Sequence, residues 1–163
     1  TALKRGKGTP ELLERMAETM WTLNDVAGQA MVEYGAHAAT DITGCGFIGH
    51  AWEMAKGSKV NIRVYASRVP VFEEALVFAK RGYLTQGDVS NREYTRGAVT
   101  LDKGVSSEMV QVMFDPQTSG GLLIALPSSQ ASALVDALHA RGVGSAVIIG
   151  EVASGDGTIT VVP

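Results

Sequence analysis

The stretch that decides the fold is "MFDPQTSGGLLIALP", which runs from Met113 to Pro127. It begins and ends like a buried strand, but its middle, Asp115 to Gly121, is polar and ends in two glycines. Because proline cannot donate to a strand ladder, the Asp115-Pro116 pair stops the first apolar run. Two adjacent glycines let another backbone or a ligand approach closely. The pattern fits either a tight structural turn or a loop that holds a ligand at the end of a sheet.

Composition points to one folded globular domain. The chain has 163 residues, of which 45% are hydrophobic and 19% charged, which is enough for a core of its own. A net charge of −3, without a basic stripe interleaved with aromatic residues, argues against a nucleic-acid surface. No apolar run approaches the roughly 20 residues that a membrane-spanning helix needs, and no signal peptide is visible. A single cysteine, Cys45, rules out an internal disulfide and fits a reducing cytoplasm.

Helical and strand patterns alternate irregularly along the chain. Apolar spacing predicts helices over residues 10–23, 26–34, 47–57, 70–82 and 128–141. Strands are predicted over residues 36–42, 60–65, 108–114, 121–126, 146–152 and 158–162, with the last two forming a hairpin around Gly155-Asp156-Gly157. Residues 82–104 form the longest irregular region. We therefore expect a single α+β domain over residues 1–163, a layered α/β sandwich with a mixed, largely antiparallel sheet.

The first candidate site is "ATDITGCGFIGH", from Ala39 to His50. Its pattern predicts a strand, a glycine-rich turn and a helix, with Asp41 near the carboxyl end of the strand. The turn would present bare N–H groups at a helix amino terminus, which favours anions, and a carboxylate beside a bound phosphate favours a bridging Mg²⁺. The alternative is that Asp41 only caps the helix and the glycines only form the turn. We interpret His50 as packed or hydrogen-bonded, not catalytic.

The second candidate site is the polar middle of the opening stretch. Gln117, Thr118 and Ser119 offer short polar donors and acceptors next to the glycine pair. The alternative is a tight connection whose side chains bond only to their own loop.

The third candidate lies in the long irregular region, which contains Asn91, Arg92, Tyr94 and Arg96. A loop of that length in a compact domain is usually functional or mobile. Its basic residues could close over phosphates, or the segment is simply a solvated loop.

Three stretches together resemble the carboxy-terminal half of the selenophosphate synthetase (selenide, water dikinase) family. They are "TALKRGK" (residues 1–7), "ATDITGCGFIGHAWEMA" (39–55) and "FDPQTSGGLLIALP" (114–127), and "NREY" (91–94) is also similar. The resemblance covers nearly the whole chain in order, and the PQTSGG core marks the wider group of aminoimidazole-ribonucleotide-synthetase-like enzymes. One departure is Cys45, where the family more often has an aromatic residue.

The resemblance implies an ATP-dependent phosphotransferase that makes selenophosphate from selenide and ATP, releases AMP and phosphate, and requires Mg²⁺. It implies two α+β domains with the active site between them. The amino-terminal domain would carry a glycine-rich segment, several metal-binding aspartates, and the catalytic Cys or selenocysteine and Lys. This chain would be the carboxy-terminal domain, inactive alone and without catalytic residues of its own. Its partners would be its own amino-terminal domain, ATP and selenide, in a cytoplasmic, homodimeric enzyme that binds neither nucleic acid nor membrane.

The family pattern also assigns residues. It implies that Asp41 is a metal ligand. The positions that it implies for nucleotide or phosphate binding are Thr43, Gly44, Gly46, Asn91, Gln117, Thr118, Ser119, Gly120 and Gly121. Three alternatives remain open: a related enzyme of the same group (aminoimidazole ribonucleotide synthetase, thiamine-monophosphate kinase or the hydrogenase-maturation carbamoyl dehydratase), a non-catalytic nucleotide-binding module, or a dimerisation module.

Overall fold

The structure is a computed structural model that describes residues 2–163; Thr1, the first residue of the basic opening stretch, lies outside the described residues. The α-helices are α1 (Pro10–Trp21), α2 (Asp25–Glu33), α3 (Gly46–Ser58), α4 (Glu73–Lys80), α5 (Gln86–Tyr94), α6 (Ser107–Phe114) and α7 (Ser128–Ala140). The strands are β1 (Ala38–Asp41), β2 (Val60–Tyr65), β3 (Val99–Leu101), β4 (Leu122–Ala125), β5 (Gly150–Ser154) and β6 (Ile159–Val162). Short 3-10 turns occur at Leu3–Arg5 and Ala66–Arg68.

The strands form two sheets. Strands β1 and β4 pair antiparallel as a two-stranded sheet, and the second sheet has the order β3-β6-β2-β5. In this second sheet β6 is parallel to both β2 and β3, whereas β5 is antiparallel to β2. The α+β class and the mixed sheet are therefore confirmed. Parallel pairs outnumber antiparallel ones in the larger sheet, so this sheet is less antiparallel than the sequence suggests.

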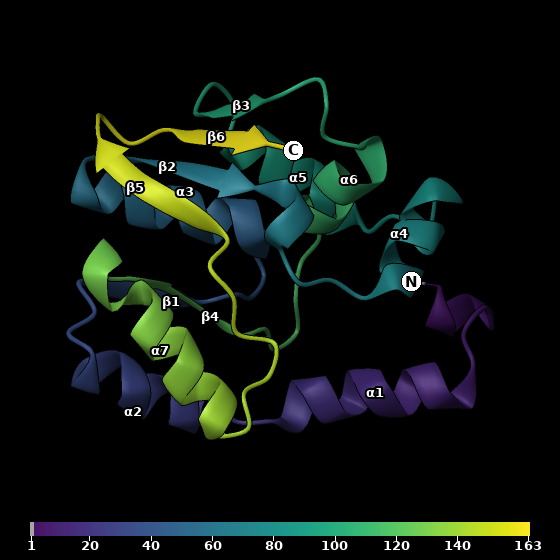
Figure 1. The fold of residues 1–163 in the computed structure, drawn as a ribbon. Coiled ribbons are helices and arrows are strands. Elements are labelled where there is room, and N and C mark those ends of the chain that lie inside the picture. Colours follow the sequence, from purple (N-terminus) through teal and green to yellow (C-terminus); the bar gives the residue numbers. More distant parts are fainter. Residues whose placement is uncertain (1) are drawn as a thin grey trace.

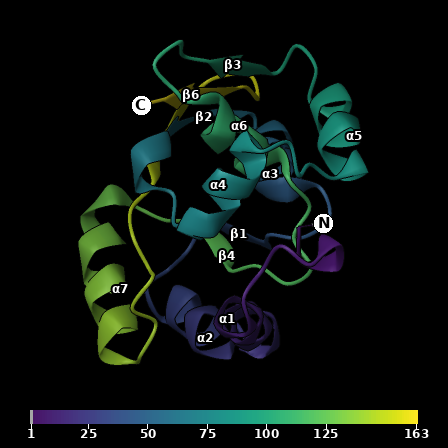
Figure 2. The ribbon, with the colours of Figure 1, turned by 90° about the vertical axis from the view of Figure 1, so that its right-hand side faces the viewer.

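The β1–β4 pair lies between α2 and α7 on one side and α3 with the larger sheet on the other (Figures 1 and 2). On one side, Leu122 and Ile124 of β4 pack on a core formed by α2 and α7. On the other side, Leu123 packs on a larger core formed by α3, α6 and the four-stranded sheet. Both faces of β4 are thus covered by apolar residues, which explains the near-continuous apolar run in its sequence. The order of layers is α2 and α7, the small sheet, α3 and α6, and the large sheet.

The predicted strand over residues 108–114 is wrong, because this segment is helix α6. Its buried residues Met109, Val110, Met113 and Phe114 lie on one helical face and enter the larger core. Ser106 is the N-cap, and its hydroxyl accepts a hydrogen bond from the Met109 N–H at 3.2 Å. The opening stretch therefore joins a helix to a strand, not two strands.

The predicted hairpin at the carboxyl terminus is also wrong, because β2 lies between β5 and β6. The connection between the two strands crosses the end of β2, where Asn61 organises it. The Oδ1 atom of Asn61 accepts hydrogen bonds from the backbone N–H groups of Asp156, Gly157 and Thr158 at 3.1, 3.3 and 3.1 Å. Strand β5 also begins at Gly150, later than the predicted Ala146.

The region 82–104 is not an irregular loop. It contains α5 and β3, and α5 begins at an N-cap, Thr85, whose hydroxyl accepts a hydrogen bond from the Asp88 N–H at 3.4 Å. Two further boundaries differ from expectation. Helix α4 begins at Glu73, three residues after the predicted proline start, and α3 continues past Gly57 to Ser58.

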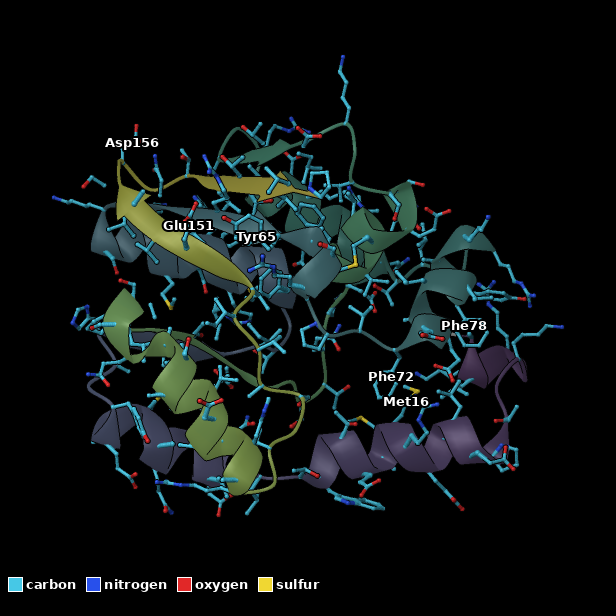
Figure 3. All side chains as sticks on the ribbon, viewed as in Figure 1. Met16, Tyr65, Phe72, Phe78, Glu151 and Asp156 are labelled. Atoms are coloured by element: carbon cyan, nitrogen blue, oxygen red, sulfur yellow. The ribbon has the colours of Figure 1, made fainter. Side chains whose placement is uncertain are left out.

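Helix α1 lies at the edge of the molecule, below α4 in the view of Figure 1. Figure 3 shows Met16 of α1 and Phe72, the N-cap residue of α4, facing each other between the two helices. The Arg15 guanidinium lies over the Phe72 ring at 5.3 Å and pairs with the Glu74 carboxylate at 2.7 Å. No helix among residues 2–163 has the length and hydropathy needed to cross a membrane.

Candidate functional site

The first and second candidate segments lie side by side as two paired loops. We call residues 41–46 the aspartate loop and residues 115–121 the PQTSGG loop. The β1–β4 ladder ends at the Asp41–Leu122 pair, and backbone hydrogen bonds continue beyond it. The Ile42 N–H donates to the Gly121 carbonyl at 3.0 Å, and the Gly120 N–H donates to the Ile42 carbonyl at 3.0 Å. A third bond, from the Gln117 N–H to the Thr43 carbonyl at 3.0 Å, joins the middles of the loops.

Asp41 is the last residue of β1, and it is exposed. This placement agrees with the sequence expectation that Asp41 ends the strand before the helix. In the described residues 2–163 there is no group of three or more His, Cys, Asp or Glu residues that could hold a metal ion. Asp41 can therefore offer one hard oxygen ligand, which suits Mg²⁺, because this ion commonly binds one or two carboxylates together with phosphate oxygens and water.

The glycines of the two loops differ in what they do. Gly46 has φ +67°, and a Cβ there would lie 2.7 Å from the Phe114 carbonyl oxygen. A Cβ on Gly120 would lie 2.5 Å from the Ile42 carbonyl oxygen. These two glycines are required by the close approach of the loops. Gly44 and Gly121 are exposed, and a Cβ on either would meet only open space, so their backbones are accessible to a ligand.

Helix α3 presents its amino terminus to the aspartate loop. Within residues 2–163, the N-cap residue Cys45 makes no capping hydrogen bond with its side chain. The N–H of Gly46, the first residue of α3, donates to the Thr43 carbonyl at 3.0 Å. The N–H groups that follow it lack a side-chain acceptor from the cap, which is the arrangement that favours an anion at a helix amino terminus. In the PQTSGG loop, Thr118 is exposed and Ser119 half-buried, so both supply accessible hydroxyls. The Gln117 amide instead donates to the Asp115 carbonyl at 3.1 Å, within its own loop.

Asn91 lies behind the two loops and braces them. It is buried on α5, and its amide nitrogen donates to the Gly44 carbonyl at 3.1 Å and to the Phe114 carbonyl at 2.9 Å. Both amide hydrogens are thereby used, one on the aspartate loop and one on the last residue of α6, which precedes the PQTSGG loop. In this structure Asn91 contributes to the candidate site by fixing the aspartate loop against the end of α6.

The expectation of an irregular loop for the third candidate is wrong, because its residues are held in or next to α5. The Arg92 guanidinium donates to both carboxylate oxygens of Asp88, at 2.8 and 3.0 Å, and lies over the Phe114 ring at 4.5 Å. The Tyr94 hydroxyl donates to Glu53 at 2.8 Å, and Arg96 pairs with Glu93. The signal that would have found this helix is Thr85 three residues before Asp88, a side-chain N-cap followed by an acidic first turn.

Asp115 links the PQTSGG loop to the start of α5. Its Oδ1 accepts a hydrogen bond from the Thr85 hydroxyl at 2.7 Å. Burial raises the pKa of the Asp115 carboxyl, and the nearby Asp88 charge adds to this shift, whereas the hydrogen bond from Thr85 opposes it. Asp115 therefore belongs to the support of the site and not to its open face.

These features define a class of protein: an α+β domain whose small central sheet ends in two paired loops, one with an exposed carboxylate and one with accessible hydroxyls. The chain belongs to the family described as AIR synthase related protein, C-terminal domain, which matches residues 2–162.

Curated relatives of the chain are named for one activity. It is 42% identical to the "Selenide, water dikinase" of Pelobacter propionicus over 93% of its own length and 44% of the relative's. It is 37% identical to "Selenide, water dikinase 2" of Peptoclostridium acidaminophilum over 94% of its length and 44% of the relative's. With the "Selenide, water dikinase" of Clostridioides difficile the identity is 35%, over 99% of this chain and 47% of the relative. The chain therefore spans under half the length of these curated relatives.

Proposed function

We propose that this chain is the carboxy-terminal domain of a selenide, water dikinase, which makes selenophosphate from selenide, ATP and water and releases AMP and phosphate. The observation that carries the proposal is the backbone pairing that brings Asp41 next to the PQTSGG loop. Residues about 80 positions apart in sequence, which the family resemblance independently assigns to ATP and Mg²⁺, thus form one surface. The names of the relatives support the choice of reaction.

In this proposal Asp41 holds Mg²⁺ together with phosphate oxygens. The donor set fits, because Asp41 is an exposed hard ligand at the end of a strand and lies close to groups that favour anions. A bound Mg²⁺ would neutralise charge on the phosphates, and phosphoryl transfer depends mainly on such neutralisation and on positioning.

The two loops would contact the phosphates of ATP. Thr43, Gly44 and the N–H groups of α3 that follow Gly46 would supply donors on one side, and Thr118, Ser119 and Gly121 would supply them on the other. Gly46, Gly120 and Asn91 act indirectly, because their contacts hold the two loops together. Gln117 contributes through its backbone bond to Thr43 and through its amide within the loop.

One carboxylate is too little for a complete site for Mg²⁺ and ATP. We propose that further metal-binding aspartates and the catalytic Cys or selenocysteine and Lys come from an amino-terminal domain, and that this chain alone has no kinase activity. We also propose that the complete enzyme is a homodimer in the cytoplasm, a reducing compartment that suits the free thiol of Cys45 in this chain.

Phosphorus NMR of reactions with ATP, Mg²⁺ and selenide tests the proposal. The full-length protein should form selenophosphate, AMP and phosphate only when selenide is present, and this chain alone should form none. Selenide-dependent turnover by this chain alone would contradict the assignment of catalysis to another domain. Turnover by the full-length protein with the substrate of one of the related enzymes, and none with selenide, would contradict the assigned reaction.

A further inference from the structure

The side chain of Asn24 joins the start of α2 to the PQTSGG loop. Its amide nitrogen donates a hydrogen bond to the Gly120 carbonyl at 3.0 Å, across 96 positions in the chain. The Gly120 oxygen can only accept, so the amide nitrogen and not the amide oxygen must face it. Asn24 is half-buried, so this bond is partly shielded from water. The PQTSGG loop is therefore held from the side of α2 as well as by the aspartate loop.

Asn24 does not serve α2 as a capping side chain. It is the N-cap residue of this helix, a position at which asparagine commonly accepts a hydrogen bond from an N–H of the first turn. Within residues 2–163, the Asn24 side chain makes no such capping bond. The stability of α2 therefore does not explain the amide at this position, whereas the bond to Gly120 does.

The bond from Asn24 fixes a peptide group that could otherwise rotate. The Gly120 N–H donates to the Ile42 carbonyl, and the Gly121 carbonyl accepts from the Ile42 N–H, both at 3.0 Å. These two bonds hold the peptide groups on either side of the Gly120–Gly121 peptide. The peptide between them has a glycine on each side, and glycine adopts backbone conformations that other residues do not. This peptide can therefore turn over without disturbing its neighbours unless the Gly120 carbonyl is held, as it is by Asn24.

The orientation of this peptide matters for an anion. The peptide is trans, so its carbonyl and its N–H point in opposite directions. With the Gly120 carbonyl on Asn24, the Gly121 N–H points away from α2, and Gly121 is exposed and borders open space. Backbone N–H groups attract anions. In the reverse orientation a carbonyl oxygen would stand in place of this N–H, and its partial negative charge would repel a phosphate.

We propose that Asn24 is a positioning residue of the phosphate site, which keeps the Gly120 carbonyl turned toward α2 so that the PQTSGG loop presents donors, and not a carbonyl oxygen, to the anion. The inference rests on the proposed function for the identity of the anion, a phosphate of ATP. Asn24 itself does not touch the anion; it acts through the Gly120–Gly121 peptide.

Three variants isolate this role. Asn24→Ala removes the amide and leaves the Gly120 carbonyl unheld. Asn24→Ser keeps a good N-cap residue for α2, but its hydroxyl is one atom closer to the backbone than the amide nitrogen and does not reach the Gly120 carbonyl. Asn61→Ala is the matched control, because the Asn61 side chain also joins segments 95 to 97 positions apart, but at the β5–β6 connection of the other sheet.

The first test is the KM for ATP of the full-length protein. Asn24→Ala and Asn24→Ser should each raise KM about tenfold with a smaller change in kcat, the size expected for one hydrogen bond to a charged group. Asn61→Ala should keep the wild-type KM, whatever its effect on stability. If Asn24→Ser has the wild-type KM, or if Asn61→Ala raises KM as much as Asn24→Ala does, Asn24 has only a structural role and the inference is overturned.

A second test separates failure of the inference from failure of the proposed function. NMR of the Gly121 amide in this chain, with inorganic phosphate as the probe, requires neither ATP nor selenide. Phosphate should shift the Gly121 signal in the wild type and in Asn61→Ala, and the two Asn24 variants should need about tenfold more phosphate for the same shift. If the full-length protein makes no selenophosphate but this difference is found, only the proposed function fails. If phosphate does not shift the signal in the wild type, or shifts it equally in the Asn24 variants, the inference is overturned.

Discussion

Gly46 and Gly44 stand two residues apart in the aspartate loop but are fixed by different constraints. Gly46 combines φ +67° with contact distance to the Phe114 carbonyl, whereas Gly44 meets neither condition. Gly46→Ala should therefore lower the free energy of unfolding by about 2 kcal/mol or more, because a left-handed backbone costs an alanine about 1–2 kcal/mol before the clash is added. Gly44→Ala is the matched control and should change it by less than about 0.5 kcal/mol. Urea unfolding of both variants measures the difference; equal losses would contradict the close approach of Gly46 to Phe114.

Asp115 makes stability depend on pH in a direction opposite to that of most paired carboxylates. Because burial raises the pKa of Asp115 in the folded state, the folded protein binds more protons than the unfolded chain between the unfolded and folded pKa values. The stability that protonated Asp115 contributes is complete below the unfolded pKa of about 3.9 and is lost as pH rises through the folded pKa.

Unfolding free energies of the wild type and Asp115→Asn, measured across acidic pH, test this sign. As pH rises from the unfolded to the folded pKa of Asp115, the wild type should lose stability relative to Asp115→Asn. Above the folded pKa, the difference in unfolding free energy between the two proteins should stay constant. Thr85→Val removes the hydrogen bond that opposes the shift, so it should extend the window to higher pH. A wild type that gains stability relative to Asp115→Asn over this range would show that the pKa is lowered instead.

At the scale of single elements, the sequence correctly predicts the helices and strands that are marked by nearby residues, such as an N-cap or a strand alternation. Helix α1 starts after the N-cap Thr9 as expected, with the Thr9 hydroxyl accepting from the Leu12 N–H at 3.2 Å. Strand β2 has the predicted alternation, with Ile62 and Val64 buried. For α6 the sequence predicts a strand, because the short run of apolar residues there fits both a buried strand and a buried helix. Only the N-cap residue Ser106 distinguishes the helix from the strand. The placement of β5 on the far side of β2 could not be predicted from local sequence, because Asn61, which holds the β5–β6 connection, is distant in sequence from both strands.

The end of α3 supplies a prediction at the same scale. Gly57 lies inside the helix with space for a side chain, whereas Lys59, the C-cap, has φ +53°. The glycine is thus two residues away from the position that favours it. Gly57→Ala and Lys59→Gly should each raise the free energy of unfolding by about 0.5–1 kcal/mol.

Thermal and urea unfolding of the two single variants and the double variant test this prediction. Ser58→Gly, in the last helical residue, is the control and should be destabilising, because glycine is unfavourable within a helix. If Ser58→Gly raises the free energy of unfolding, or if Lys59→Gly lowers it, then α3 does not end at Ser58 with Lys59 as its C-cap.

At the scale of the whole molecule, the sequence locates the two loops and their family but not their support. Asp41 and the PQTSGG loop stand out as separate segments, and their likeness to one family indicates that they share a site. The support from α5 depends on Asn91, for which the sequence suggests a ligand-binding role in a mobile loop. The Asn91 amide bonds to the carbonyls of Gly44 and Phe114, which are 70 residues apart in the chain, so no local sequence pattern predicts these two hydrogen bonds. Tertiary contacts of this kind are what the sequence does not reveal.

The proposed site depends above all on the exposed Asp41 carboxylate, which would share Mg²⁺ with the phosphates of ATP. Asp156 is a suitable control, because it is also exposed but lies in the connection between β5 and β6, at the edge of the other sheet (Figure 3). Both aspartates can be changed to asparagine, which keeps the shape of the side chain and removes its charge.

The most direct measurement is the Mg²⁺ dependence of selenide-dependent AMP formation by the full-length protein. Asp41→Asn should raise the Mg²⁺ concentration for half-maximal activity by about tenfold or more, since a lost charged ligand costs more than about 1.4 kcal/mol. Asp156→Asn should leave it at the wild-type value. If Asp41→Asn also shows the wild-type Mg²⁺ dependence, Asp41 does not hold the metal, and the proposed site is contradicted.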